Sequence, residues 1–136
     1  MAAESDIADA LFARLAQYTA HPIVPPNTDI PKPSDWRYLE PRFVPNVANR
    51  MFIGSDDPHQ LLGLFQINVH WSKLRGEIEP RLAAEAVAAL FPCDLRLPAG
   101  DATVRVTKRA DIREMIISND MPDVIVPVIV SWEAYA

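Results

Sequence analysis

Seven of the thirteen prolines of this chain lie in one stretch, between residues 22 and 45. Proline has no backbone N–H, so a segment that repeats it every few residues cannot form a central strand of a sheet. The stretch is therefore predicted to be loop, with one short edge strand at Tyr38–Val44. The full 136 residues are enough to hide roughly two-thirds of the unfolded surface in one core, which predicts a single domain over residues 1–136.

Two helices are predicted from apolar residues at helical spacing. The first has Ser5 as its cap and ends before Pro22, because the residue preceding a proline avoids helical angles. Its apolar positions are Ile7, Leu11, Leu15 and Tyr18. The second covers Glu77–Phe91 and is stopped by Pro92. Its apolar positions are Ile78, Leu82, Ala86, Leu90 and Phe91.

The clearest predicted strand is 61–72, in which Phe65, Ile67, Val69 and Trp71 alternate with Leu64, Gln66, Asn68 and His70, so that one face is in the core and the other is polar. Three more strands are predicted at 103–108, 112–118 and 124–132. The last is apolar on both faces, which indicates that helices or a second subunit cover both sides, although Pro127 favours an edge position. The order predicts an α+β fold with two helices packed on one face of a mostly antiparallel β-sheet.

The segment 46–60 is expected to be a long hairpin arm or loop. Its apolar patch is either an anchor tucked onto the core or part of an oligomer interface, where aromatic, Met and Arg residues are enriched. The residues predicted to contact another subunit or a tube are Arg50, Met51, Phe52, Ile53, Asp56, Asp57 and His59.

Few residue patterns in the chain point to chemistry. Asp56, Asp57 and His59 have the donor types of a metal site, but Asp and Pro are also what turns require, so no metal or cofactor is predicted. Cys93 with His70 as its base would make a nucleophilic pair if the fold joined them, whereas a lone cysteine is more often a small apolar residue. A small Cys/His enzyme is thus an alternative, and no catalytic residue is assigned.

The formal charge of −5 disfavours binding to nucleic acid duplexes. Arg105, Lys108, Arg109 and Arg113 form a basic stretch, but acidic residues interrupt it, which favours a solvated face or ion pairs between subunits. A nucleic-acid-binding accessory protein remains a further alternative. One cysteine excludes an internal disulfide and suits the reducing cytoplasm, and neither a membrane span nor a secretion signal is expected.

Several stretches together resemble the tail terminator-like proteins of long-tailed bacteriophages and prophages, related to the small terminator of the lambda type. The resemblance covers nearly the whole chain. It rests on Ile7-Ala8-Asp9-Ala10-Leu11, Phe43-Val44-Pro45-Asn46, Gly63-Leu64-Phe65-Gln66-Ile67-Asn68-Val69, Leu90-Phe91-Pro92 and Val126-Pro127-Val128-Ile129-Val130-Ser131-Trp132.

This resemblance implies a structural, non-enzymatic role in the tail of the virion. Copies of the chain would assemble in the bacterial cytoplasm into a hexameric ring that caps the tail tube and joins it to head-connecting proteins. The implied partners are the chain itself, the tail tube protein and a head-tail connector protein, while DNA passes through the ring without specific binding. The segment 46–60 looks like the long arm that such proteins order on assembly.

Overall fold

The computed structural model describes residues 4–50 and 59–135, and for residues 47–50 and 59 it describes the backbone alone. The chain forms two helices and a six-stranded sheet, which confirms the α+β class. The elements, in chain order, are α1 (Glu4–Leu15), β1 (Tyr38–Arg50), β2 (His59–Ser72), α2 (Ile78–Ala88), β3 (Arg96–Ala99), β4 (Ala102–Val106), β5 (Asp111–Ile112) and β6 (Asp123–Tyr135).

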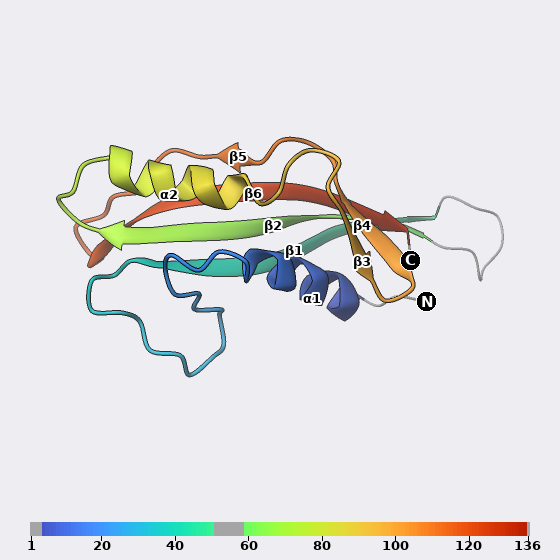
Figure 1. Ribbon diagram of the computed structural model, residues 1–136, viewed down its shortest axis with the longest axis horizontal. Coiled ribbons are helices and arrows are strands. Elements are labelled where there is room, and N and C mark those ends of the chain that lie inside the picture. The colour runs from blue at the N-terminus through green and yellow to red at the C-terminus, as the bar shows by residue number, and fades with distance from the viewer. Residues whose placement is uncertain (1–3, 51–58, 136) are drawn as a thin grey trace.

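The sheet has the strand order β1-β2-β6-β4-β3, with β5 also paired to β6. Every paired strand is antiparallel to its neighbour. The long strands β1, β2 and β6 run along most of the molecule, and α1 and α2 lie in front of them (Figure 1). The short hairpin β3–β4 crosses one end of the sheet, near the start of α1.

The predicted edge strand at Tyr38 is confirmed and extends to Arg50. Leu39 turns its backbone away from β2, because its N–H donates to the Pro22 carbonyl (2.9 Å) and its carbonyl accepts from Val24 (2.8 Å). The backbone N–H and C=O groups of successive residues point alternately toward β2 and away from it, and the register with β2 is regular as far as Pro45. The backbone groups of Pro41 and Pro45 therefore also point away from β2. Neither proline therefore removes a hydrogen bond from the β1–β2 ladder.

The expectation that Pro127 marks an edge is wrong, since β6 lies between β2 on one side and β4 and β5 on the other. The Pro127 carbonyl accepts from the N–H of Arg113 (2.8 Å), so the side of Pro127 that lacks a donor faces the segment after β5. There the pairing is interrupted: β5 ends at Ile112, and only an isolated bridge follows, between Ile116 and Ile125. The predicted strand 112–118 is broken at the same place for this reason.

The core lies between the helices and the facing side of the sheet. Alternate β2 residues from Phe65 to Trp71 are buried there, and they are paired with alternate β6 residues from Val130 back to Val124. Phe65 receives an edge contact from Phe12 of α1 (5.4 Å between ring centroids) and another from Phe91 just after α2 (5.7 Å). Phe12 of α1 and Phe91, three residues beyond α2, therefore pack on the same aromatic side chain.

The bounds of α1 differ from the prediction, while its apolar face agrees with it. Ile7, Leu11 and Leu15 are completely buried. Ser5 lies inside the helix instead of capping it, and the helix ends at Leu15, so that Tyr18 follows in a turn.

The predicted second helix is confirmed as α2, with its last turn shorter than expected. The side that it buries carries small or compact residues, Pro80, Ala83, Ala84 and Val87. Ile78 and Leu82, the bulky residues whose spacing predicted the helix, are exposed to solvent. Small residues let the helix approach the sheet closely, and they leave its larger apolar residues on the outside.

Candidate functional site

The predicted contact segment is only partly described. Arg50 and His59 are paired with each other at the ends of β1 and β2. Met51, Phe52, Ile53, Asp56 and Asp57 lie outside the described residues. The contact role of all seven residues, and the possible metal donors among them, therefore stay predictions.

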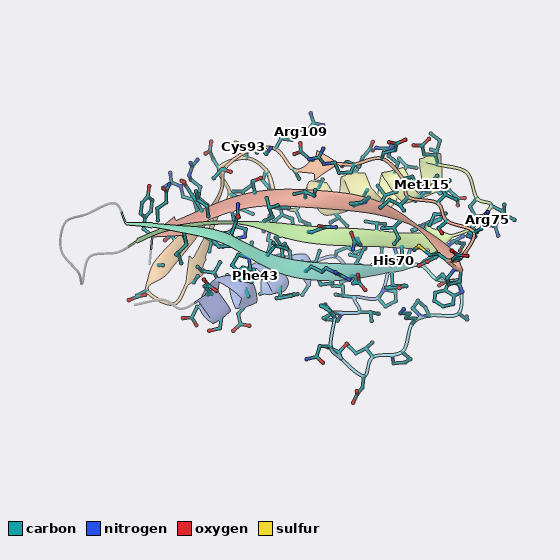
Figure 2. The ribbon with its side chains drawn as sticks, turned by 180° about the vertical axis from the view of Figure 1, so that it is seen from behind. Phe43, His70, Arg75, Cys93, Arg109 and Met115 are labelled. Carbon is teal, nitrogen blue, oxygen red and sulfur yellow. The ribbon has the colours of Figure 1, made fainter. Side chains whose placement is uncertain are left out.

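The proposed pair of Cys93 and His70 is not brought together. Figure 2 shows the two side chains far apart, with His70 on the sheet and Cys93 beyond the end of α2. The Cys93 thiol is exposed and lies 3.7 Å from the Thr107 carbonyl oxygen, with which it makes a weak hydrogen bond. His70 is buried and engaged elsewhere. The arrangement required for a Cys/His nucleophile is thus absent from the described chain.

His70 is part of a polar cluster on the side of the sheet that the helices leave open. Its Nδ1 lies 2.5 Å from Oδ2 of Asp123, and both side chains are buried. Its Nε2 lies 4.0 Å from the Glu40 carboxylate and has no hydrogen-bond partner among the described residues. The imidazole also stacks on Tyr38, with the ring centroids 4.2 Å apart.

The remaining members of this cluster connect it to the sheet surface. The Asn68 amide donates to Glu40 (3.4 Å) and accepts from Gln66 (2.9 Å), while Arg42 forms an ion pair with Glu40 (3.3 Å). Burial, together with the carboxylates of Asp123 and Glu40, raises the pKa of Tyr38 to about 12, so its hydroxyl stays protonated. The cluster joins β1, β2 and β6 through side chains. The polar alternation of β2 placed His70 on this face, but nothing in the sequence identified its partners.

A second group of aromatic residues holds the proline-rich segment against β2. His21 Nδ1 lies 2.7 Å from the Tyr18 hydroxyl, and its ring meets Trp71 edge-on (4.9 Å). The Arg37 guanidinium lies over the same indole (4.8 Å). Burial and the nearby charge of Arg37 lower the pKa of His21, and Asp35 partly opposes them. These effects favour the neutral form of the His21 ring.

Ion pairs within the chain engage part of the predicted basic stretch. Arg105 makes two short contacts with Glu133 across the β4–β6 pair (2.9 and 2.7 Å) and one with Asp94 (2.6 Å). Lys108 forms an ion pair with Asp111 (3.2 Å). These two cations already have carboxylate partners, so they form no free basic groove for phosphates.

Exposed apolar side chains gather at the end of the molecule where β2 leads into α2. Leu74 is 100% exposed, Ile78 70%, Ile117 64% and Leu82 59%. With Met115 they make up a surface that we call the apolar end. Figure 2 shows Met115 and Arg75 at this end. A hollow of about 320 Å³ opens here, between the segment after β5 and the turn at residues 73–77, which follows β2 and which we call the Leu74 turn.

The apolar end is the most distinctive surface of the described chain. Scattered exposed apolar residues are normal, but adjacent ones are typical of a contact with another molecule. The sequence contained this signal in the periodic residues Ile78 and Leu82, although the same periodicity is also what a buried helix face shows. Which side of α2 would be buried could not be read from that spacing.

The described residues offer little else for chemistry. Within residues 4–50 and 59–135, no three His, Cys, Asp or Glu side chains are grouped so that they could hold a metal ion. Neither of the two described helices combines the length and the apolar character that crossing a membrane requires.

Comparison with known proteins identifies the family. The model of the family described as "Phage tail terminator protein" matches residues 6–132. A solved structure is similar with a TM-score of 0.75 and 24% sequence identity, over 97% of this chain and 95% of that chain, which shows a shared fold. No curated protein matches the chain. Because the family model spans all but the two ends, the chain belongs to the phage tail terminator protein family.

Proposed function

We propose that this protein completes the tail of a phage or prophage by assembling into a ring of six copies, which caps the tail tube and joins it to head-connecting proteins. The family membership carries this proposal. On this account its activity consists of contacts with copies of itself, with the tube protein and with a connector protein. No covalent bond is made or broken, and no cofactor is used. Assembly takes place in the bacterial cytoplasm, before the virion leaves the cell.

The blocked edges of the sheet support assembly through side chains. An exposed strand edge recruits another strand by its backbone N–H and C=O groups. Two of the β1 residues whose backbone points away from β2, Pro41 and Pro45, have no N–H to offer. Between Leu39 and Pro45, Phe43 is therefore the one residue with an outward N–H. The strand at the opposite edge, β3, is only four residues long and contains Pro98. A ring would therefore use side-chain surfaces, such as the apolar end and the predicted contact segment from Arg50 to His59.

The charge of the protein supports passive passage of DNA. A formal charge of −5 repels phosphates, and the carboxylates that hold Arg105 and Lys108 reduce their attraction for the backbone. A ring lined by such a surface would let DNA slide without binding it tightly.

The proposal is tested by mixing the purified protein with tail tubes polymerised from the tube protein of the same phage. Co-sedimentation measures binding, and negative-stain electron microscopy locates the protein on the tube. We expect the protein at one end of each tube, in a ratio of six copies to one tube end. Unpolymerised tube protein is the matched control and should bind far less, because it offers no complete tube end. Binding along the whole tube, or none, would contradict the proposal.

A further inference from the structure

We propose that the hollow at the apolar end receives, from a second copy of this chain, the segment 51–58 that links β1 to β2 and that we call the tip. This inference rests on the proposed function and deepens it, because it names the two surfaces that meet between neighbouring subunits. The receiving surface consists of described residues: Leu74, Met115, Ile117 and Val124 line the hollow together with the stem of Lys73. The occupant is known by its sequence, Met51-Phe52-Ile53 followed by Asp56 and Asp57.

Leu74 is the residue that most needs an explanation. Its φ of +63° lies in the left-handed region, which is unfavourable for a residue with a Cβ and which asparagine or glycine occupies more readily. Its side chain is completely exposed, so the fold of the single chain gains nothing from its apolar atoms. A leucine that is unfavourable both in backbone and in solvent is accounted for if another molecule covers it.

The orientation of α2 leads to the same surface. The helix buries alanines and exposes Ile78 and Leu82, one turn apart on its outer side. Ile117 continues the apolar surface across the hollow. In a monomer, polar residues at these positions would be more favourable, because these side chains contact water.

The tip of a hairpin cannot reach the hollow of its own chain. The register pairs Tyr38 with His70 at one end of the hairpin and Arg50 with His59 at the other. The hollow begins at Ser72, the last residue of β2, whereas the tip follows Arg50. The 14 residues of β2 at about 3.3 Å each separate the two ends by roughly 45 Å. The occupant must therefore come from another copy.

The chemistry of the two surfaces is complementary. The three apolar residues of the tip suit the apolar lining of the hollow, and the two aspartates that follow suit its basic rim. Lys73 lines the hollow, with its ammonium donating to the Ser118 carbonyl (2.8 Å), and the exposed Arg75 lies two residues further along the chain. The acidic Glu77 is paired with Arg81 (3.3 Å). A contact between opposite ends of two copies is head-to-tail, and such contacts close into a ring when the rotation between subunits allows it.

Disulfide trapping tests the proposed contact. In a Cys93→Ser background, Phe52→Cys is combined with Ile117→Cys, and the protein is oxidised both at high concentration and on polymerised tail tubes. We expect disulfide-linked ladders of up to six copies on a non-reducing gel. The control combines Phe52→Cys with Ala89→Cys, an exposed residue at the other end of α2, and should give at least tenfold less cross-linking.

The Leu74→Asn variant separates assembly from folding. Asparagine tolerates the left-handed backbone and removes an exposed apolar side chain, so the melting temperature should stay the same or rise. Self-association should weaken by about 10- to 150-fold, because burying a leucine side chain contributes about 1.5–3 kcal/mol to the free energy of association.

The possible outcomes distinguish this inference from the proposed function. If the protein binds tube ends but Phe52→Cys links to the tube protein or to nothing, the inference is overturned and the proposed function stands. Unchanged self-association of Leu74→Asn would overturn it equally. If the protein neither binds tubes nor associates with itself, both are wrong.

Discussion

Replacing Gly63 by alanine tests the packing of the sheet against its largest buried side chain. Gly63 lies opposite Trp132 in the β2–β6 register. A Cβ built on Gly63 would stand 2.5 Å from the Trp132 ring and 2.6 Å from the Val44 backbone carbonyl. The indole stacks on Phe43 (5.4 Å), so it cannot move aside freely, and the carbonyl belongs to the β1 backbone.

The magnitude follows from these two contacts. Overpacking a well-packed core costs typically 1–3 kcal/mol, and a clash with backbone places this substitution at the upper end, about 3 kcal/mol. An unfolding entropy of about 2.1 cal/mol/K per residue over 136 residues converts this into a fall in melting temperature of roughly 10 °C. Urea unfolding followed by tryptophan fluorescence measures the loss directly.

A matched glycine provides the control. Gly76 has a φ of +76° but no heavy atom within 4 Å of its Cβ position, so Gly76→Ala meets backbone strain without a clash. It should cost about 1 kcal/mol. If Gly63→Ala stays within 0.5 kcal/mol of the wild type, or costs no more than Gly76→Ala, the described packing of Trp132 is refuted.

Three further predictions concern other parts of the molecule. Because folding lowers the pKa of His21, the folded chain binds a proton at this ring less readily than the unfolded chain does, so the contribution of His21 to the free energy of unfolding should be complete above pH 6.5 and fall below it. Urea titrations of the wild type and His21→Phe at pH 7.5 and 5.5 measure this contribution. An identical pH dependence of the two proteins would contradict the prediction. Asp123→Ala should lower the free energy of unfolding by about 2 kcal/mol, because it leaves the buried Nδ1 of His70 without its partner. Asp123→Asn should lower it by less. Equal losses of unfolding free energy for the two variants in urea would argue against the hydrogen bond. Cys93→Ser should leave binding to tube ends unchanged in the co-sedimentation assay, and a loss of binding with an intact fold would show that the thiol has a role.

The sequence predicted those parts of the fold in which local pattern and tertiary burial agree. The alternation of 61–72 predicted β2, and Ile7, Leu11 and Leu15 predicted the buried face of α1. The prolines at 41 and 45 correctly indicated an edge. That the backbone of both prolines points away from β2, and so preserves the pairing with β2, became clear only from the hydrogen bonds of Leu39.

Other features depended on contacts that a linear pattern does not contain. Pro127 lies in a central strand because the strand beside it is interrupted there, and the sequence does not show which neighbour its missing donor faces. β3 was not predicted, although Gly100-Asp101 between Ala99 and Ala102 is a recognisable two-residue hairpin turn.

The candidate site was predicted less completely than the fold. Oligomer contacts were expected from the segment after Arg50, whereas the described surface adds the apolar end, whose residues had been assigned to a helix pattern alone. Ile78 and Leu82 show why: an outward apolar stripe has the same spacing as an inward one, and only the packing of Ala83 and Ala84 against the sheet decides between them.

Cryo-electron microscopy of tail tubes bound by this protein tests the central claim most directly. The account predicts a ring of six subunits at one end of each tube, with the β1–β2 hairpin of every subunit ending at the Leu74 turn of the next. Bare tube ends, or subunits that attach singly to the tube and do not touch one another, would contradict it.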